Sequence, residues 1–370
     1  MTIHIAVLIL TLLNGVFILS NRSWSDRWAV KCYIVLSELL LFLAIGLRGY
    51  TVGLDTRVYR AFFNRLANDP SLARRVGWEP LFLLIIRIGM FFRSFQLVLI
   101  ICAAVTCIGF GVFVYNNSKT RWTSFWFFFF YITLNLYFNS MHLIRQICAM
   151  AIAINIYTIL SKEKNRVAYI KSVILVLLAC GFHITAAIFI IPIIMAVVLK
   201  KINRKTILLA GLAALVGSLF LTVGQSFLLS LISRFGRYEN DERLAQGNIG
   251  VYAVAMILIK VIMTVMVLWL DPQRKENREL YQLTFINVIA TMFFCLQTRT
   301  QFALRIGYWY EMFFPLYVPL FVSKFRIKST RQVLYALFFI FGVVYFFYMM
   351  RFGGVKSNRG TVPYVFYWQV

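Results

Sequence analysis

The sequence predicts an all-α polytopic membrane protein with about twelve transmembrane helices, and three observations lead to this fold class. Of the 370 residues, 61% are hydrophobic and only 14% are charged, and the mean hydropathy is +0.79. Soluble globular domains have about 45–50% apolar and about 25% charged residues. The apolar residues also form long runs, which are typical of membrane spans. We therefore expect a single integral membrane domain over residues 1–370.

Ten apolar runs approach the length of a membrane-spanning helix, which needs about 20 mostly apolar residues. They are 3–20, 30–47, 95–115, 123–140, 142–160, 206–230, 250–270, 280–297, 308–323 and 332–350. The stretch 167–199 is too long for one span and has basic clusters at both ends, which the positive-inside rule places in the cytoplasm. We therefore expect a short hairpin there, with its tip near 181–183. The phenylalanine run 127–130 lies inside one span and is expected to face lipid.

Each membrane span takes the chain to the opposite side. Placing both ends of this hairpin in the cytoplasm therefore assigns every loop to one side of the membrane. The cytoplasmic loops would be 21–31, 116–122, 161–171, 200–205, 271–279 and 324–331. The outward segments would be 48–94, the turn near 140, 181–184, 231–249, 298–307 and 351–370. Parity also requires that Glu79–Phe92 does not cross the membrane. Its length and its arginines favour a re-entrant or interfacial helix near 79–93.

The basic residues divide unevenly between the two sides. The net charge is +25, and the predicted cytoplasmic loops hold 11 Lys and 9 Arg, against 1 Lys and 16 Arg outside. The positive-inside rule treats the two residues alike, whereas arginine binds phosphate through paired hydrogen bonds and keeps its charge. The outward arginines therefore predict a phosphate site. The excess of arginine outside could instead come from random drift in composition, or from contacts of arginine with anionic lipid head groups. Because the charges lie between apolar runs, we expect no nucleic-acid partner.

The first outward loop contains the densest set of candidate ligand-binding residues. Arg48, Asp55, Arg57 and Tyr59 lie within it, and Gly53 permits a tight turn there. These residues are suited to clamp a phosphate or a sugar. An ordinary solvated loop is the alternative.

Four further outward residues are candidates for chemistry. Glu79 precedes Pro80 at the start of the expected interfacial helix, where it would cap that helix or act as a general base. His142 and Arg145 are three positions apart and are expected on one helix face, with the arginine either turned to a cavity or snorkelling to the interface. His183, at the hairpin tip, is either structural or a proton-transfer group.

Two arginines flank the outward turn near residue 300. They are Arg299 and Arg305, and Glu311 is expected to pair with Arg305 or another arginine. The loop 231–249 is either a lid or a solvated segment. Nucleotide-binding, zinc-protease and hydrolase motifs are missing, and the outward carboxylates are scattered. We therefore expect no cofactor and no metal site, and expect arginines to neutralise any phosphate leaving group.

Five short motifs follow one another along the chain. They are Arg48…Gly53-x-Asp55-Thr56-x-x-Tyr59, Glu79-Pro80-x-Phe82-x-Leu84, Leu143-x-Arg145-Gln146-x-x-Ala149, Phe182-His183-x-Thr185-Ala186, and Arg305-x-x-x-Trp309/Tyr310 with Pro315 after it. In order, spacing and loop placement they resemble the EpsG-like group of Wzy-type polysaccharide polymerases, which assemble bacterial O-antigen, capsule and exopolysaccharide. The resemblance runs from about residue 40 to about residue 320.

This resemblance implies a GT-C-like glycosyltransferase of the bacterial inner membrane, with its active site facing the periplasm. It would transfer a growing glycan from undecaprenyl pyrophosphate to the non-reducing end of another lipid-linked repeat unit, without a metal. The donor and the acceptor would both be undecaprenyl-pyrophosphate-linked oligosaccharide repeat units. Membrane lipids and a chain-length regulator are the further partners that it implies.

The same resemblance implies roles for the candidate residues. His183 or Glu79 would take or position the proton of the acceptor hydroxyl, and Arg145 would bind pyrophosphate. The further substrate-binding residues would be Arg48, Asp55, Arg57, Tyr59, His142, Arg299 and Arg305, with the loops 48–94 and 231–249 contributing to the site. A membrane O-acyltransferase, which also uses a lone intramembrane histidine, and a flippase for lipid-linked oligosaccharide are the alternative functions.

Overall fold

Most of the predicted helices are present, and the chain divides into two compact units, while the predicted span 206–230 lies outside the described residues beyond position 212. The computed structural model describes residues 1–69, 71–72, 77–163, 165–188, 191, 205–212, 251–270, 278–296, 301–352 and 358–370. Across these ranges every regular element is a helix, apart from an isolated bridge between Arg48 and Phe366. The first unit combines Met1–Ile190 with Phe325–Val370, and the second is Ile191–Lys324.

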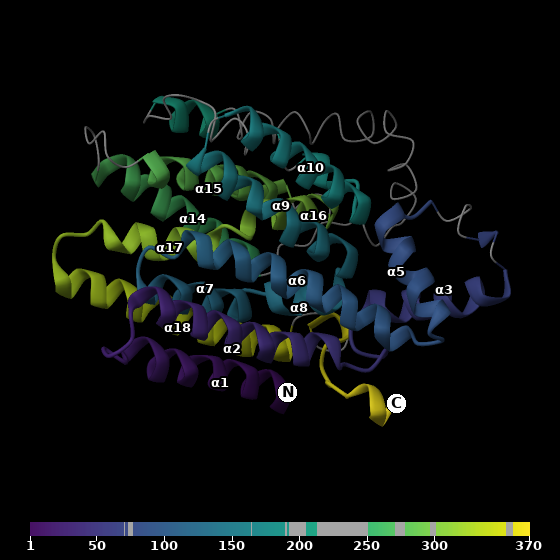
Figure 1. The fold of residues 1–370 in the computed structure, drawn as a ribbon. Coiled ribbons are helices and arrows are strands. Elements are labelled where there is room, and N and C mark those ends of the chain that lie inside the picture. The colour runs from purple at the N-terminus through teal and green to yellow at the C-terminus, as the bar shows by residue number, and fades with distance from the viewer. Residues whose placement is uncertain are drawn as a thin grey trace. The chain divides into compact units, whose positions relative to one another are not determined.

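The first unit is a bundle of long helices with two short helices at one end (Figure 1). Its helices are α1 (Thr2–Ser20), α2 (Asp26–Gly46), α3 (Leu54–Asn68), α5 (Pro80–Phe91), α6 (Phe95–Asn117), α7 (Arg121–Thr133), α8 (Leu136–His142), α9 (Ile144–Lys162), α10 (Arg166–Phe182) and α18 (Lys328–Phe352). The helix α6 packs between α2 and α9, and α9 also packs against α10. The amphipathic α3 and the short α5 form the end that carries the candidate site.

Six described helices have the length and apolar composition of a membrane span. They are α1, α2, α6, α9, α18 and, in the second unit, α15 (Arg278–Leu296). The helices α5, α17 (Phe314–Ser323) and the central part of α14 (Val251–Leu270) are apolar but shorter. The chain is therefore a multi-pass membrane protein. The total of about twelve spans and the GT-C-like architecture stay predictions.

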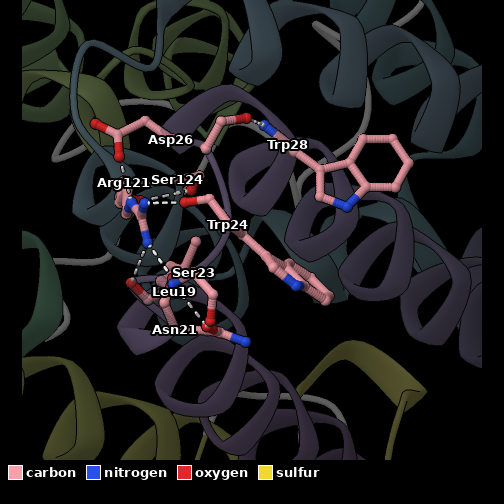
Figure 2. A network of polar contacts seen from close by, with 9 residues as sticks. Leu19, Asn21, Ser23, Trp24, Asp26, Trp28, Arg121 and Ser124 are labelled. Atoms are coloured by element: carbon pink, nitrogen blue, oxygen red, sulfur yellow. Dashed lines mark hydrogen bonds and ion pairs between the residues drawn. The ribbon is translucent and has the colours of Figure 1, made fainter.

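The loops of the first unit gather at two opposite ends of the bundle. At one end Arg121, which begins α7, donates to the carbonyls of Asn21 and Trp24 and pairs with Asp26 (Figure 2). Lys162 Nζ donates to Asn116 at the same end, at 3.0 Å. The predicted cytoplasmic loops 21–31, 116–122 and 161–171 thus meet, as one side of a membrane requires.

The opposite end holds several of the predicted outward segments. His4 Nε2 lies 3.0 Å from the carbonyl oxygen of Thr361, and the N–H of Gly49 donates to the carbonyl of Val365. The C-terminal segment therefore packs against the beginning of α1 and the end of α2. The structure groups these segments as the loop assignment predicted, while which end faces the cytoplasm stays a prediction.

The expected hairpin at 167–199 is described in its first arm and at its tip. The first arm is α10, which ends at Phe182, and His183 follows in an extended conformation with φ −157°. Apart from Ile191, residues 189–199 lie outside the described part of the chain. The helix α5 also agrees with the expected short helix near 79–93, because it has only 12 residues.

Two predicted spans are wrong as continuous helices. The run 123–140 is divided into α7 and α8 at Leu134–Asn135, where Asn135 has φ 72°, in the left-handed region that asparagine tolerates better than most residues. The run 308–323 is divided between α16 (Gln301–Glu311) and α17. Pro315 lies in the first turn of α17, where its missing N–H is tolerated.

The phenylalanine run 127–130 does not face lipid, contrary to the expectation. Its four side chains are at most 1% exposed. The helix α7 contacts α1, α2, α6 and α18, so it has neighbours on several faces. Phe129 stacks on Phe339 of α18 with ring centroids 4.9 Å apart, and Phe127 contacts Phe110 of α6. The run therefore forms part of the core of the bundle.

In the second unit, α14, α16 and α17 all pack against α15. Lys260 of α14 pairs with Glu311 at the end of α16, at 2.6 Å, and both side chains are at most 2% exposed. Asn287 of α15 accepts from Lys260 Nζ at 3.4 Å, and the Phe314 ring lies 4.2 Å from the same atom. The expected pair of Glu311 with Arg305 or another arginine is wrong. Residues six apart point to different helix faces, and the face of Glu311 meets α14.

The buried pair makes Lys260→Met strongly destabilising. We expect a loss of about 3–5 kcal/mol in the free energy of unfolding, because the Glu311 carboxylate would remain buried without its cation. The double variant Lys260→Met/Glu311→Leu should regain most of this loss. Thermal unfolding in detergent measures both, with the exposed Lys205→Met as the control. A double variant no more stable than the single one would contradict the pairing.

Candidate active site

Four segments of the first unit bring Tyr59, Glu79, Arg145 and His183 together. Tyr59 lies in α3, Glu79 directly precedes α5, Arg145 opens α9 and His183 follows α10. Arg145 Nη1 lies 2.5 Å from Glu79 Oε2, and Arg145 Nε donates to the Tyr59 hydroxyl at 3.1 Å. His183 Nδ1 lies 3.4 Å from Glu79 Oε1. We call these four residues the Glu79 cluster, in which one carboxylate lies between a guanidinium and an imidazole.

The Glu79 carboxylate joins these segments and does not cap its own helix. Pro80 begins α5, and the Glu79 side chain makes no hydrogen bond to the first turn of that helix. Instead Oε1 accepts from the backbone N–H of Ile184 at 3.3 Å, in addition to its contact with His183. Glu79 is 6% exposed. The Glu79 side chain therefore does not cap α5, which was one of its two predicted roles.

Three aromatic rings surround the Arg145 guanidinium. Its central carbon lies 5.6, 5.2 and 5.7 Å from the ring centroids of Tyr59, Trp78 and Phe82. The rings also contact one another edge to face, with centroids 5.1 to 5.6 Å apart. A cation over aromatic faces is attracted by their quadrupoles. The Arg145 side chain keeps 17% exposure, so it is held in a fixed orientation while part of it stays accessible.

The neighbours of Glu79 determine its protonation state. Burial alone would raise the pKa of this carboxyl group, but the hydrogen bond from His183 and the positive charge of Arg145 outweigh it. Together they lower the pKa of Glu79 to about 2. The group is therefore ionised at neutral pH and is a weak base.

The motif residues between Gly53 and Tyr59 fasten α3 to the junction of α8 and α9. Gly53 has φ 89°, and a Cβ there would lie 2.3 Å from the carbonyl oxygen of Met141. The Thr56 hydroxyl donates to that same oxygen at 3.1 Å. Asp55 Oδ1 lies 3.8 Å from His142 Nδ1. These contacts of Gly53 and Thr56 bring Tyr59, in the same helix, to Arg145. The spacing from Gly53 to Tyr59 in the motif is explained by this arrangement.

Arg48 and Arg57 bind backbone carbonyls in this structure. Arg48 is 1% exposed, and its guanidinium donates to the carbonyls of Ile45 and Met141. Burial lowers the pKa of Arg48 to about 10, so it remains charged at neutral pH. Arg57 is exposed and donates twice to the carbonyl of Thr51, at 3.1 and 3.2 Å. Their predicted role in binding substrate stays a prediction.

The expectation that His142 and Arg145 share one helix face is wrong. His142 is the last residue of α8, and Leu143 has the non-helical angles φ −96° and ψ 52° before α9 begins. The break between the helices turns the two side chains to different partners. His142 approaches Asp55, whereas Arg145 approaches Glu79 and Tyr59.

The remaining predicted residues belong to the second unit. Arg305 is half-buried in α16, while Arg299 and the loop 231–249 lie outside the described residues. That they share a substrate with Arg145 stays a prediction. Within the described ranges, no three His, Cys, Asp or Glu side chains gather as a metal site would require. Independence of a metal also stays a prediction.

Sequence reasoning missed Trp78 and said little of Thr185. Trp78 directly precedes Glu79-Pro80, and an aromatic residue beside that dipeptide was the available signal. Its contact with Arg145, 67 positions later, depends on the tertiary structure. Thr185, two positions after His183, is buried, and its hydroxyl has no hydrogen-bond partner among the described residues.

The sequence matches the EpsG family over residues 31–366, which is nearly the whole chain. The protein belongs to the EpsG family. This is a family of Wzy-like polysaccharide polymerases, so the resemblance inferred from the five motifs is confirmed. No curated protein and no solved structure matches the chain. Four of the five EpsG-like motifs lie in the first unit, and each contributes a residue to the Glu79 cluster.

The ionised Glu79 predicts a pH-dependent contribution to stability. Its pKa falls from an ordinary 4.5 to about 2, so its contribution is complete above about pH 4.5 and is lost as the pH falls through 2. The shift corresponds to about 3 kcal/mol. We expect Glu79→Gln to be less stable than the wild type at pH 7, with the difference shrinking toward pH 2.

Thermal unfolding in detergent over this pH range measures the difference. The control is Glu163→Gln, which changes an exposed carboxylate at the opposite end of the bundle. A difference between wild type and Glu79→Gln that stays constant with pH would contradict the contacts of Glu79.

Proposed function

We propose that the protein is the polymerase that joins lipid-linked repeat units of a bacterial surface polysaccharide, using undecaprenyl pyrophosphate as the leaving group. Membership in the EpsG family supports the class of enzyme. The observation that carries the assignment of the active site is the Glu79 cluster, because four family motifs converge on it. We place this end of the bundle at the periplasmic face, from the loop assignment and from the outward excess of arginine.

His183 is the better general base of the two candidates. In the proposed reaction the acceptor hydroxyl loses a proton while its oxygen bonds to the anomeric carbon of the donor, and the bond from that carbon to pyrophosphate breaks. A carboxylate with a pKa of about 2 has little tendency to accept this proton. The ring nitrogen Nδ1 of His183 faces Glu79, which favours the tautomer with its proton on Nδ1. Nε2 is then the basic nitrogen, and Glu79 stabilises the imidazolium that forms.

Arg145 is the first candidate to neutralise the leaving pyrophosphate. Its guanidinium is positioned by Glu79, Tyr59 and three aromatic rings, so little reorganisation is needed when negative charge develops. A phosphate oxygen would share this guanidinium with Glu79. Arg48, Arg57, Arg299 and Arg305 remain further candidates, and the reaction as proposed uses no metal.

Deletion of the gene in its host tests the reaction class. We expect single repeat units on the acceptor and no ladder when surface polysaccharide is separated on a gel. Complementation with the wild type or with the exposed variant Arg22→Gln should restore the ladder, whereas His183→Ala should not. Complete loss of repeat units would instead indicate a flippase, and an intact ladder lacking an acyl group would indicate an acyltransferase.

The geometry of Arg145 predicts that Lys cannot replace it. We expect Arg145→Ala to reduce polymer yield by a factor of about 100 or more, and Arg145→Lys nearly as much. A single ammonium group cannot bond Glu79 and Tyr59 together while stacking on the rings. Yield is measured in the complemented deletion strain and normalised to the amount of protein in the membrane. The exposed Arg326→Lys is the matched control, and full yield from Arg145→Lys would leave only a requirement for charge.

A further inference from the structure

Residues 358–370 lie against the loop that begins the first family motif. We call them the 358–370 segment, and we call residues 47–53 the motif loop; Figure 1 shows the segment in yellow beside the beginning of α1. Three backbone hydrogen bonds of 2.8 to 3.0 Å join the two, from the N–H of Gly49 to the carbonyl of Val365, from Gly53 to Gly360 and from Tyr367 to Leu47. The Tyr364 hydroxyl also donates to the carbonyl of Ala44, in the last turn of α2, at 2.9 Å. The motif loop therefore takes its backbone partners from a segment far along the chain.

The motif loop and the 358–370 segment are in close contact around Gly49. A Cβ added at Gly49 would lie 2.6 Å from Val370 Cγ2, 3.1 Å from Val365 Cγ2 and 3.3 Å from the carbonyl oxygen of Phe366. The preceding residue, Arg48, pairs with Phe366 in an antiparallel bridge, and its buried guanidinium donates to the carbonyl of Met141 in α8. The segment therefore binds the backbone of the motif loop, while the Arg48 side chain ties the same loop to α8.

His4 of α1 ties the same segment to α8. Its Nε2 lies 3.0 Å from the carbonyl oxygen of Thr361, and its Nδ1 lies 3.0 Å from the Tyr137 hydroxyl. Because a carbonyl oxygen only accepts, Nε2 carries the proton, and in the neutral ring Nδ1 accepts from Tyr137. His4 and Thr361 are fully buried, and the His4 ring meets the Tyr364 ring edge to face with centroids 5.5 Å apart. One side chain therefore bonds both the 358–370 segment and α8.

Both attachments of the segment lead to the Glu79 cluster. The motif loop continues directly into α3, where the Thr56 hydroxyl donates to the Met141 carbonyl at 3.1 Å and, one turn later, the Tyr59 hydroxyl accepts from Arg145 Nε. The helix α8 is separated by Leu143 alone from α9, which carries Arg145 in its first turn. The 358–370 segment therefore supports the elements on both sides of the hydrogen bond between Tyr59 and Arg145.

We propose that the 358–370 segment positions the active site, with His4 and Tyr364 as the positioning residues that fasten it. They act through the motif loop and α3 on Tyr59, and so on the orientation of the Arg145 guanidinium. This inference rests on the proposed function, and the family match, which covers residues 31–366, includes most of the segment. A displacement of about 1 Å at a reacting group can lower a rate about a hundredfold. Loosening the segment should therefore reduce polymerisation.

Hydrogen exchange of the purified full-length protein in detergent tests the placement without any substrate. The variant His4→Phe keeps an aromatic ring but removes both ring nitrogens, and Tyr364→Phe removes only a hydroxyl. We expect each to raise exchange rates severalfold, and the double variant at least tenfold, in peptides covering 47–60, with rates in 153–162 of α9 unchanged. The control Tyr169→Phe, at an exposed position of α10, should change neither region. Unchanged rates in 47–60, or an equal rise in both regions, would overturn the proposal.

Polymer yield in the complemented deletion strain tests the link to the active site. At equal amounts of protein in the membrane, we expect His4→Phe and Tyr59→Phe each to lower the yield at least tenfold. The two changes combined should lower it no more than about twofold further, because they act on the same hydrogen bond. The variant His4→Gln, whose amide N–H can still donate to the Thr361 carbonyl, should keep at least half of the wild-type yield.

Three results in this strain would overturn the positioning role. They are full yield from His4→Phe, losses that multiply in the double variant, and a His4→Gln yield as low as that of His4→Phe. Because the exchange measurement needs no substrate, a failure of the positioning role is distinguishable from a failure of the proposed polymerase reaction.

Discussion

The contacts of the Glu79 carboxylate are the constraint on which the proposed active site depends. One side chain joins Arg145 at the beginning of α9, His183 after α10 and the backbone of Ile184. These segments lie far apart in the sequence, and Glu79 precedes the short helix α5, which has only 12 residues. Because a buried carboxylate needs partners that offset its desolvation, the cluster holds the beginning of the short α5 against the beginning of α9 and the end of α10. The weak basicity that results also assigns the proton-accepting role in our proposal to His183.

The arginines of the predicted outward segments perform more than one physical task. Arg48 is buried and Arg57 is exposed, yet both donate to backbone carbonyls. Arg145 instead binds a carboxylate and stacks on aromatic rings. Part of the arginine excess therefore serves loop structure, where five N–H donors in a planar group satisfy carbonyls that no regular element pairs. Fewer arginines therefore remain candidates to bind phosphate, and Arg145 is the first candidate among the described residues.

Helix existence was predictable from the sequence, but helix continuity was not. Hydropathy located α1, α2, α6 and α9, because burial in lipid requires long apolar runs whatever their neighbours. The same signal missed the break at Asn135 and the division near Pro315, since a discontinuous helix can be as apolar as a continuous one. The phenylalanines at 127–130 show the same limit. Composition cannot distinguish a lipid-facing ring from one packed against α6 and α18.

The sequence by itself determined the membrane class, the short helix near 79–93 and the motif residues of the EpsG family. These depend on local composition and spacing. Only the tertiary structure decided which polar groups meet. Arg145 pairs with Glu79, and Glu311 pairs with Lys260 where an arginine was expected. In a low-dielectric interior an ionised group needs a partner, and helical periodicity alone does not specify which helix supplies it.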